Sequence, residues 1–66
     1  MRRPLQPGEL RKVWKLGSVV LDRDGDVWTW ERWDGDLIWG CTRASSTFDT
    51  LVELNAEFGP MEIEDE

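Results

Sequence analysis

Residues 19–39 decide the fold, and they read VVLDRDGDVWTWERWDGDLIW. The triplet Asp-Gly-Asp occurs twice, at 24–26 and 34–36, and each copy lies between apolar and aromatic runs. Asp-Gly in this setting is a strong hairpin signal, because both central positions of a type I′ turn need positive φ. Residues 18–42 are therefore predicted to form a three-stranded antiparallel meander. The expected strands lie near 18–22, 27–33 and 37–42.

Two-residue loops at both Asp-Gly pairs would fix the register of this meander. They place Trp30 opposite Trp39 and Leu21 opposite Trp28, and period-two alternation then sorts the side chains onto two faces. A longer first loop, with Gly25 in a bulge, stays open and would shift only the first strand. The expected core face carries Val19, Leu21, Trp28, Trp30, Leu37, Trp39 and Cys41, with Arg32 at its edge. The second face carries Val20, Val27, Thr29, Glu31, Trp33, Ile38 and Thr42.

One helix is expected after the meander, near residues 47–58. Ser46 is a candidate N-cap, and Asp49 three residues later gives a pattern like a capping box. Gly59 ends the helix, and Pro60 prevents its continuation. The residues expected on its apolar side are Phe48, Leu51, Leu54, Asn55 and Phe58.

A helix laid across the tryptophan-rich face gives an α+β fold of β-β-β-α order. Met61 and Ile63 could add a short final strand. The helix should bury Trp28, Trp30 and Trp39, which leaves Trp33 as the most exposed of the strand tryptophans.

The charge of this 66-residue chain, −6 in total, is unevenly distributed. Residues 1–16 carry five basic residues and one acidic residue, whereas residues 44–66 carry seven acidic residues and no basic one. Two explanations stay open: attraction between the ends, in one chain or across a dimer, or a partner site on either segment. The expected division is a flexible basic arm over 1–12, one small domain over 13–63 and an acidic tail over 64–66, and residues 1–8 are expected to lack regular structure. Whether 9–16 is strand, helix or coil is open, with an extended segment favoured.

The composition argues against most catalytic sites. Histidine is absent, so a Ser-His-Asp triad, a Cys-His pair and a histidine-ligated metal are excluded within the chain. The single cysteine, Cys41, excludes an internal disulfide and a four-thiolate zinc site. Cys41 is expected to face Trp28 in the core as an inert thiol. We therefore expect no enzyme activity, no cofactor and no small-molecule substrate.

A partial match to a calcium loop is explained better by turn chemistry. The matching residues are Asp22, Asp24, Gly25, Asp26 and Glu31. The first ligand position of an EF-hand would be Val20, and strands rather than helices flank the segment, so no metal site is assigned. The chain also has no 18-residue apolar run and no secretory leader, so we expect no membrane association and a cytoplasmic location.

The stretch Gly17–Trp28, GSVVLDRDGDVW, and the later Phe58-Gly59-Pro60 carry a family resemblance. They resemble the signature of many short proteins from actinobacteria and their bacteriophages. The resemblance spans roughly residues 13–63 and implies strands joined by an Asp-Gly turn, a second aromatic strand and a short helix. It implies no catalytic or ligand-binding residues, and a phage-encoded chain would act in the host cytoplasm.

The expected function is that of a small accessory protein that binds a host protein or itself as a homodimer. One helix can cover only one sheet face, so the apolar residues Val20, Val27, Trp33 and Ile38 form the hypothetical partner-binding surface. Cover of that face by the N-terminal segment, through Val13 or Trp14, is the competing explanation. The alternative function is a nucleic-acid-linked module, either an acidic DNA mimic or a binder through its basic arm, although the acidic body disfavours nucleic acid. The cations of that arm are Arg2, Arg3, Arg11, Lys12 and Lys15.

Overall fold

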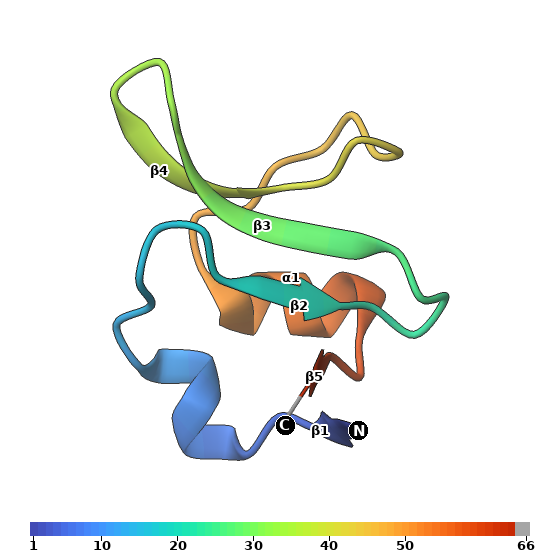
Figure 1. The fold of residues 1–66 in the computed structure, drawn as a ribbon. Coiled ribbons are helices and arrows are strands. Elements are labelled where there is room, and N and C mark those ends of the chain that lie inside the picture. Colours follow the sequence, from blue (N-terminus) through green and yellow to red (C-terminus); the bar gives the residue numbers. More distant parts are fainter. Residues whose placement is uncertain (65–66) are drawn as a thin grey trace.

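The computed structural model describes residues 1–64 and has an α+β architecture (Figure 1). Five antiparallel strands form one sheet in the order β1-β5-β2-β3-β4, and a single α-helix packs against it. The predicted α+β class and the central meander are confirmed, but the sheet has two more strands than expected. The elements are β1 (Arg2–Pro4), the 3₁₀ helix η1 (Pro7–Arg11), β2 (Val19–Leu21), β3 (Val27–Trp33), β4 (Asp36–Gly40), α1 (Leu51–Phe58) and β5 (Glu62–Glu64).

The two additional strands come from the ends of the chain. β1 pairs with β5, which in turn pairs with β2, and the Leu5 amide donates to the Met61 carbonyl at 3.0 Å. The N-terminal ammonium lies 3.2 Å from the Glu64 carboxylate, so attraction between the ends operates within one chain. The expectation that residues 1–8 lack regular structure is wrong, because β5, which is distant in sequence, supplies hydrogen-bond partners for β1 that no local signal reveals. The possible final strand is confirmed as β5, and residues 65–66 of the expected acidic tail lie outside the described residues.

The segment 9–16 does not form the favoured extended strand. Its first three residues, Glu9–Arg11, belong to η1, and residues 12–16 have no helix or strand.

The second hairpin has the predicted register. Trp30 pairs with Trp39, and the strands are joined by the two-residue loop Asp34-Gly35. Both loop residues have positive φ, 50° for Asp34 and 87° for Gly35, as a type I′ turn requires.

The first hairpin differs from the favoured register by one residue. Val20, not Leu21, pairs with Trp28, because the loop spans Asp22–Asp26. A one-residue shift reverses both faces of a strand, so Val20 points to the core while Val19 and Leu21 point to the second face. The open alternative of a longer first loop, which shifts only the first strand, is therefore the one observed.

The helix begins later than predicted, at Leu51, with Thr50 rather than Ser46 as its N-cap. The Thr50 hydroxyl accepts a hydrogen bond from the Glu53 amide at 3.3 Å. Phe48 stays extended because its backbone exchanges two hydrogen bonds with Trp39, at 2.8 and 3.2 Å, along the free side of β4. The predicted end is confirmed, since the Gly59 amide donates to the Asn55 carbonyl as the C-cap.

The core lies between the sheet and α1. Its fully buried residues are Val20, Trp28, Trp39, Leu51, Leu54 and Met61. Burial of a large apolar side chain contributes about 2 kcal/mol, so the two central indoles are major contributors to stability. Trp30 is partly buried, and its ring centroid lies 5.1 Å from that of Trp39. Trp33 is 66% exposed, which confirms it as the most exposed strand tryptophan.

Candidate functional site

The second face of the β3–β4 hairpin holds three of the four residues predicted to bind a partner. Val27 and Trp33 are exposed on this face, and Ile38 lies on the same face but is only 6% exposed. Val20 does not belong to the surface, because the shifted register buries it in the core. Val19 occupies the second face in its place and is exposed. We call Val19, Val27, Trp33 and Ile38 the outer apolar face.

The expected N-terminal cover of this face is absent from the described residues. Trp14 instead packs edge-on against Trp39 on the core side, with ring centroids 5.6 Å apart, and Val13 is 97% exposed. Residues from the segment 41–47 lie beside the outer apolar face instead. Together with the hairpin they line a cavity of about 410 Å³ that includes Ile38. Trp33 remains exposed despite this partial cover.

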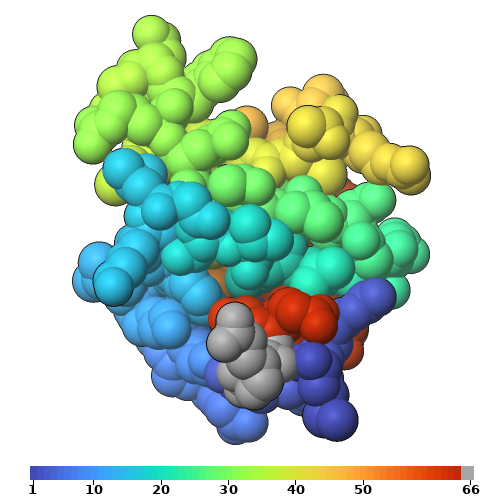
Figure 2. Space-filling model, viewed as in Figure 1, coloured from blue at the N-terminus to red at the C-terminus, as the bar shows by residue number. Residues whose placement is uncertain are grey.

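The end of the hairpin presents Trp33 to solvent. Residues 31–37 are all exposed, and this end projects from the body of the molecule, as the light-green lobe in Figure 2 shows. Asp34 follows Trp33 in the chain and Asp36 pairs with it across the turn, and neither forms an ion pair within residues 1–64. We call residues 33–36 the hairpin tip. It carries one large apolar group and two unpaired negative charges.

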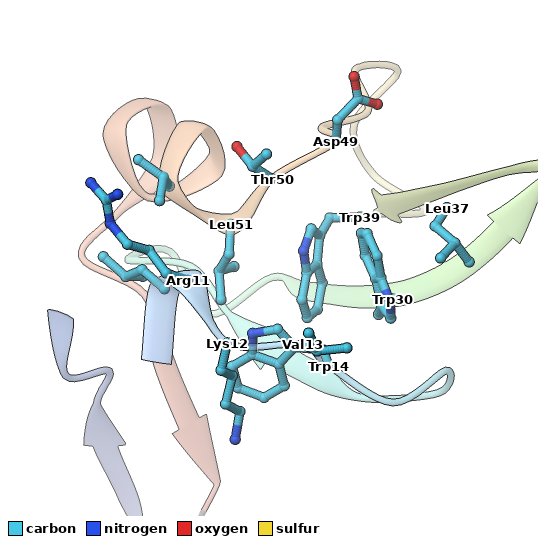
Figure 3. Close-up of a pocket in the computed structure, with 12 residues that line it drawn as sticks. Arg11, Lys12, Val13, Trp14, Trp30, Leu37, Trp39, Asp49, Thr50 and Leu51 are labelled. Atoms are coloured by element: carbon cyan, nitrogen blue, oxygen red, sulfur yellow. The ribbon is translucent and has the colours of Figure 1, made fainter. Parts of the chain in front are cut away.

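A groove of about 590 Å³ lies on the opposite side of the hairpin (Figure 3). It is formed by three segments distant in sequence: the end of η1 with the residues after it, strands β3 and β4, and the start of α1. We call this feature the tryptophan groove. Its lining residues are Leu10, Arg11, Lys12, Val13, Trp14, Trp30, Leu37, Trp39, Asp49, Thr50, Leu51 and Val52.

The charged residues of the tryptophan groove are mainly basic. The Lys12 ammonium lies 4.1 Å from the centre of the Trp14 ring, and the Trp14 indole N–H donates to the Glu9 carbonyl at 3.1 Å. Arg11 and Lys12 are exposed, and neither forms an ion pair with a carboxylate of the described residues. In Figure 3 the carboxylate of Asp49 and the guanidinium of Arg11 both point away from the tryptophans, whereas Lys12 lies over Trp14. The groove can therefore bind an apolar group by stacking while its rim attracts negative charge.

Sequence reasoning missed this groove because the conformation of residues 9–16 was open. The available signal was an aromatic residue, Trp14, within a basic stretch. Only the packing of Trp14 on Trp39 turns that stretch into one wall of a groove.

The cations of the hypothetical basic arm are divided between different places. Arg2 and Arg3 belong to β1, whereas Arg11 and Lys12 line the tryptophan groove, and Lys15 lies in the loop before β2. Arg2 lies 4.0 Å from the Glu64 carboxylate. The Arg3 guanidinium donates to both oxygens of the Glu9 carboxylate, at 2.7 and 2.8 Å.

The Arg3–Glu9 pair also holds η1 in place. Hydrogen bonds from the Arg3 side chain and the Gln6 amide lower the pKa of Glu9 to about 2. The Gln6 amide donates at 2.8 Å as part of a capping box, so Glu9 both starts η1 and binds β1. The Arg3 side chain is thus used in the fold rather than presented to phosphate.

Asp22, which matched part of a calcium loop, is an internal hydrogen-bond acceptor. Its carboxylate accepts from the amides of Asp24 and Asp26 at 2.9 and 3.0 Å and from the Trp28 indole N–H at 3.0 Å. Burial opposes ionisation, but these hydrogen bonds outweigh it and lower the pKa of Asp22 below its ordinary value. Within residues 1–64, no three histidine, cysteine or acidic side chains are grouped to hold a metal ion.

Cys41 lies just beyond the end of β4 and is only partly buried, although it packs against the core. The expectation of a fully internal thiol facing Trp28 is therefore met only in part.

No helix among residues 1–64 is long and apolar enough to cross a membrane. Comparison of the chain with protein-family models, curated proteins and solved structures finds no match.

Proposed function

We propose that this chain is a small non-enzymatic protein that acts by binding another protein, either a host protein or a second copy of itself. The contact surface is the outer apolar face of the β3–β4 hairpin, with Trp33 at its centre. The observation that carries the proposal is the 66% exposure of Trp33 at the end of β3, directly before the two-residue type I′ turn.

The other four tryptophans support this choice by contrast. Trp28 and Trp39 are fully buried, and Trp14 and Trp30 pack against the Trp39 ring. Leaving one large indole in water has a free-energy cost that a partner would remove, and tryptophan is among the residues most enriched at binding hot spots.

As the sequence suggests, the proposed protein uses no cofactor and no small-molecule substrate. It acts in the cytoplasm and comes from an actinobacterium or a bacteriophage. The alternative of a nucleic-acid-linked module is less well supported, because Glu9 engages Arg3 and Glu64 lies beside Arg2.

The test is a matched pair of alanine variants, Trp33→Ala and Leu16→Ala. Both side chains are exposed, but Leu16 lies outside the outer apolar face. Partners captured from a lysate of the source cells, and self-association measured by sedimentation, should both be followed. Trp33→Ala should weaken partner binding or self-association by about 2 kcal/mol, or about 30-fold in Kd. Leu16→Ala should leave the same Kd unchanged. Equal binding by wild type and Trp33→Ala would refute the proposal, provided that circular dichroism shows both variants folded.

A further inference from the structure

The hairpin tip and the tryptophan groove are complementary in shape and in charge. The tip projects from the body of the molecule and carries an exposed indole, Trp33, together with the exposed carboxylates of Asp34 and Asp36. The groove is concave, contains three tryptophans, and carries Arg11 and Lys12. Both pairs of charges lack an ion-pair partner among residues 1–64.

The tip of a chain is not placed to fill the groove of the same chain. Trp33 lies on the outer apolar face, whereas Trp30 and Leu37, which line the groove, lie on the opposite face of the same hairpin. Reaching the groove would require the two-residue turn to reverse the face of Trp33, and the pairing of Trp33 with Asp36 prevents this. The occupant must therefore come from another molecule.

We propose that the tryptophan groove receives the hairpin tip of a second copy of this chain. This inference rests on the proposed function and names the partner of the Trp33 surface. In the complex, the Trp33 indole enters the groove beside Trp14, Trp30 and Trp39. Asp34 and Asp36 then approach Arg11 and Lys12 of the other copy.

Size and symmetry are consistent with this arrangement. The groove volume of about 590 Å³ falls within the range of about 300–1,000 Å³ typical of ligand pockets, so it can receive one indole with its neighbours. Each copy carries one tip and one groove, so a two-fold dimer forms two identical contacts and closes without a chain of further copies. Ion pairs at an exposed rim are screened by salt, so the dimer should weaken as ionic strength rises.

The experiment uses the full chain in three forms, with self-association measured by analytical ultracentrifugation over a wide concentration range. The tip variant is Trp33→Ala. The groove variant combines Arg11→Glu and Lys12→Glu, and Leu16→Ala is the control. All the substituted residues are exposed, and circular dichroism checks that each variant folds.

The decisive sample is an equimolar mixture of the tip and groove variants. Each variant alone should dimerise at least about 30-fold more weakly than wild type, because both of its contacts are damaged. The mixture retains one intact contact, between the normal tip of the groove variant and the normal groove of the tip variant. It should therefore dimerise more tightly than either variant alone, and Leu16→Ala should match wild type.

Three outcomes would overturn the inference. The first is a wild-type chain that stays monomeric up to concentrations of about 1 mM, well above the Kd range of specific complexes. The second is a groove variant that dimerises as tightly as wild type, and the third is a mixture no tighter than its components.

The proposed function can survive these outcomes. If the inference fails but Trp33→Ala still abolishes binding of another protein, the outer apolar face binds a different partner. If Trp33→Ala changes neither self-association nor partner capture, both proposals are wrong.

Discussion

The loops at Asp24-Gly25 and Asp34-Gly35 contain the same triplet, Asp-Gly-Asp, but they connect their strands differently. The first loop spans Asp22–Asp26, whereas the second consists of Asp34 and Gly35 alone. The first is folded against the body of the protein, and the Arg23 amide donates to the Phe58 carbonyl at the end of α1 at 3.1 Å. The second projects into solvent (Figure 1).

The difference arises two residues before each Asp-Gly pair, where the first loop has Asp22 and the second hairpin has Arg32. Asp22 is 2% exposed, and its carboxylate organises the loop and binds the Trp28 indole. Arg32 is exposed and continues the ladder opposite Leu37. The buried Asp22 carboxylate therefore lengthens the first loop. The second hairpin has no such acceptor, and it adopts the two-residue turn that Asp-Gly favours locally.

The largest difference in the free energy of unfolding is expected between the variants Asp22→Ala and Arg32→Ala. Removing the Asp22 carboxylate leaves the buried Trp28 indole N–H and two amides without their acceptor, so the free energy of unfolding should fall by about 3 kcal/mol. Arg32→Ala at the matched position should change it by less than about 0.5 kcal/mol. Urea unfolding followed by tryptophan fluorescence measures both. A loss below about 1 kcal/mol for Asp22→Ala would contradict the role of this carboxylate.

Acid should weaken the first loop. The pKa of Asp22 is lowered in the folded state, so its ionised form stabilises the protein above the ordinary value of 3.8, and this contribution is lost as the pH falls below it. Asp22→Asn should remove that part of the pH dependence, giving a smaller difference in unfolding free energy between pH 7 and pH 3. Urea unfolding at the two pH values tests this, with Arg32→Ala as a control that keeps the wild-type difference. If Asp22→Asn shows the same difference in unfolding free energy between pH 7 and pH 3 as wild type, another group causes the acid sensitivity.

The glycine requirement should be equal in the two loops despite their different lengths. Gly25 and Gly35 have φ of 85° and 87°, and no atom lies within 4 Å of a Cβ added at either position. Alanine should therefore cost only backbone strain, about 1–2 kcal/mol at each site. Thermal unfolding of Gly25→Ala and Gly35→Ala measures the two costs side by side. A much larger cost at one site would show that its loop is held by more than backbone conformation.

The smallest effect should come from asparagine at the first residue of each Asp-Gly pair. Asp34 has positive φ, and asparagine tolerates this conformation well, so Asp34→Asn should be neutral or stabilising by up to about 0.5 kcal/mol. Asp24 does not have positive φ, so Asp24→Asn should bring no such gain. Precise urea midpoints for the two variants and wild type test the difference. A gain at Asp24 but not at Asp34 would reverse our assignment of the turns.

The faces on which the candidate residues lie were predicted correctly for the hairpin with the two-residue turn and incorrectly for β2. The two-residue turn places Trp33, Ile38 and Glu31 on one face in sequence and structure alike. Val20 was assigned to the wrong face because its strand shifts with the first loop. The start of the helix was mislocated because Ser46 is a favoured N-cap residue with Asp49 three residues later, although Thr50 and Glu53 match the Thr-x-x-Glu capping box more closely.

The sequence alone determined the α+β class, the β2–β3–β4 meander, the end of α1 at Phe58 and the exposure of Trp33. Each depends on interactions between neighbouring residues, such as the φ of a turn or the alternation of a strand. The pairing of β1 with β5, the burial of Asp22 and the tryptophan groove depend on tertiary contacts. These features join segments far apart in the chain, and the contacts that stabilise a buried carboxylate or a terminal strand exist only after the chain has folded.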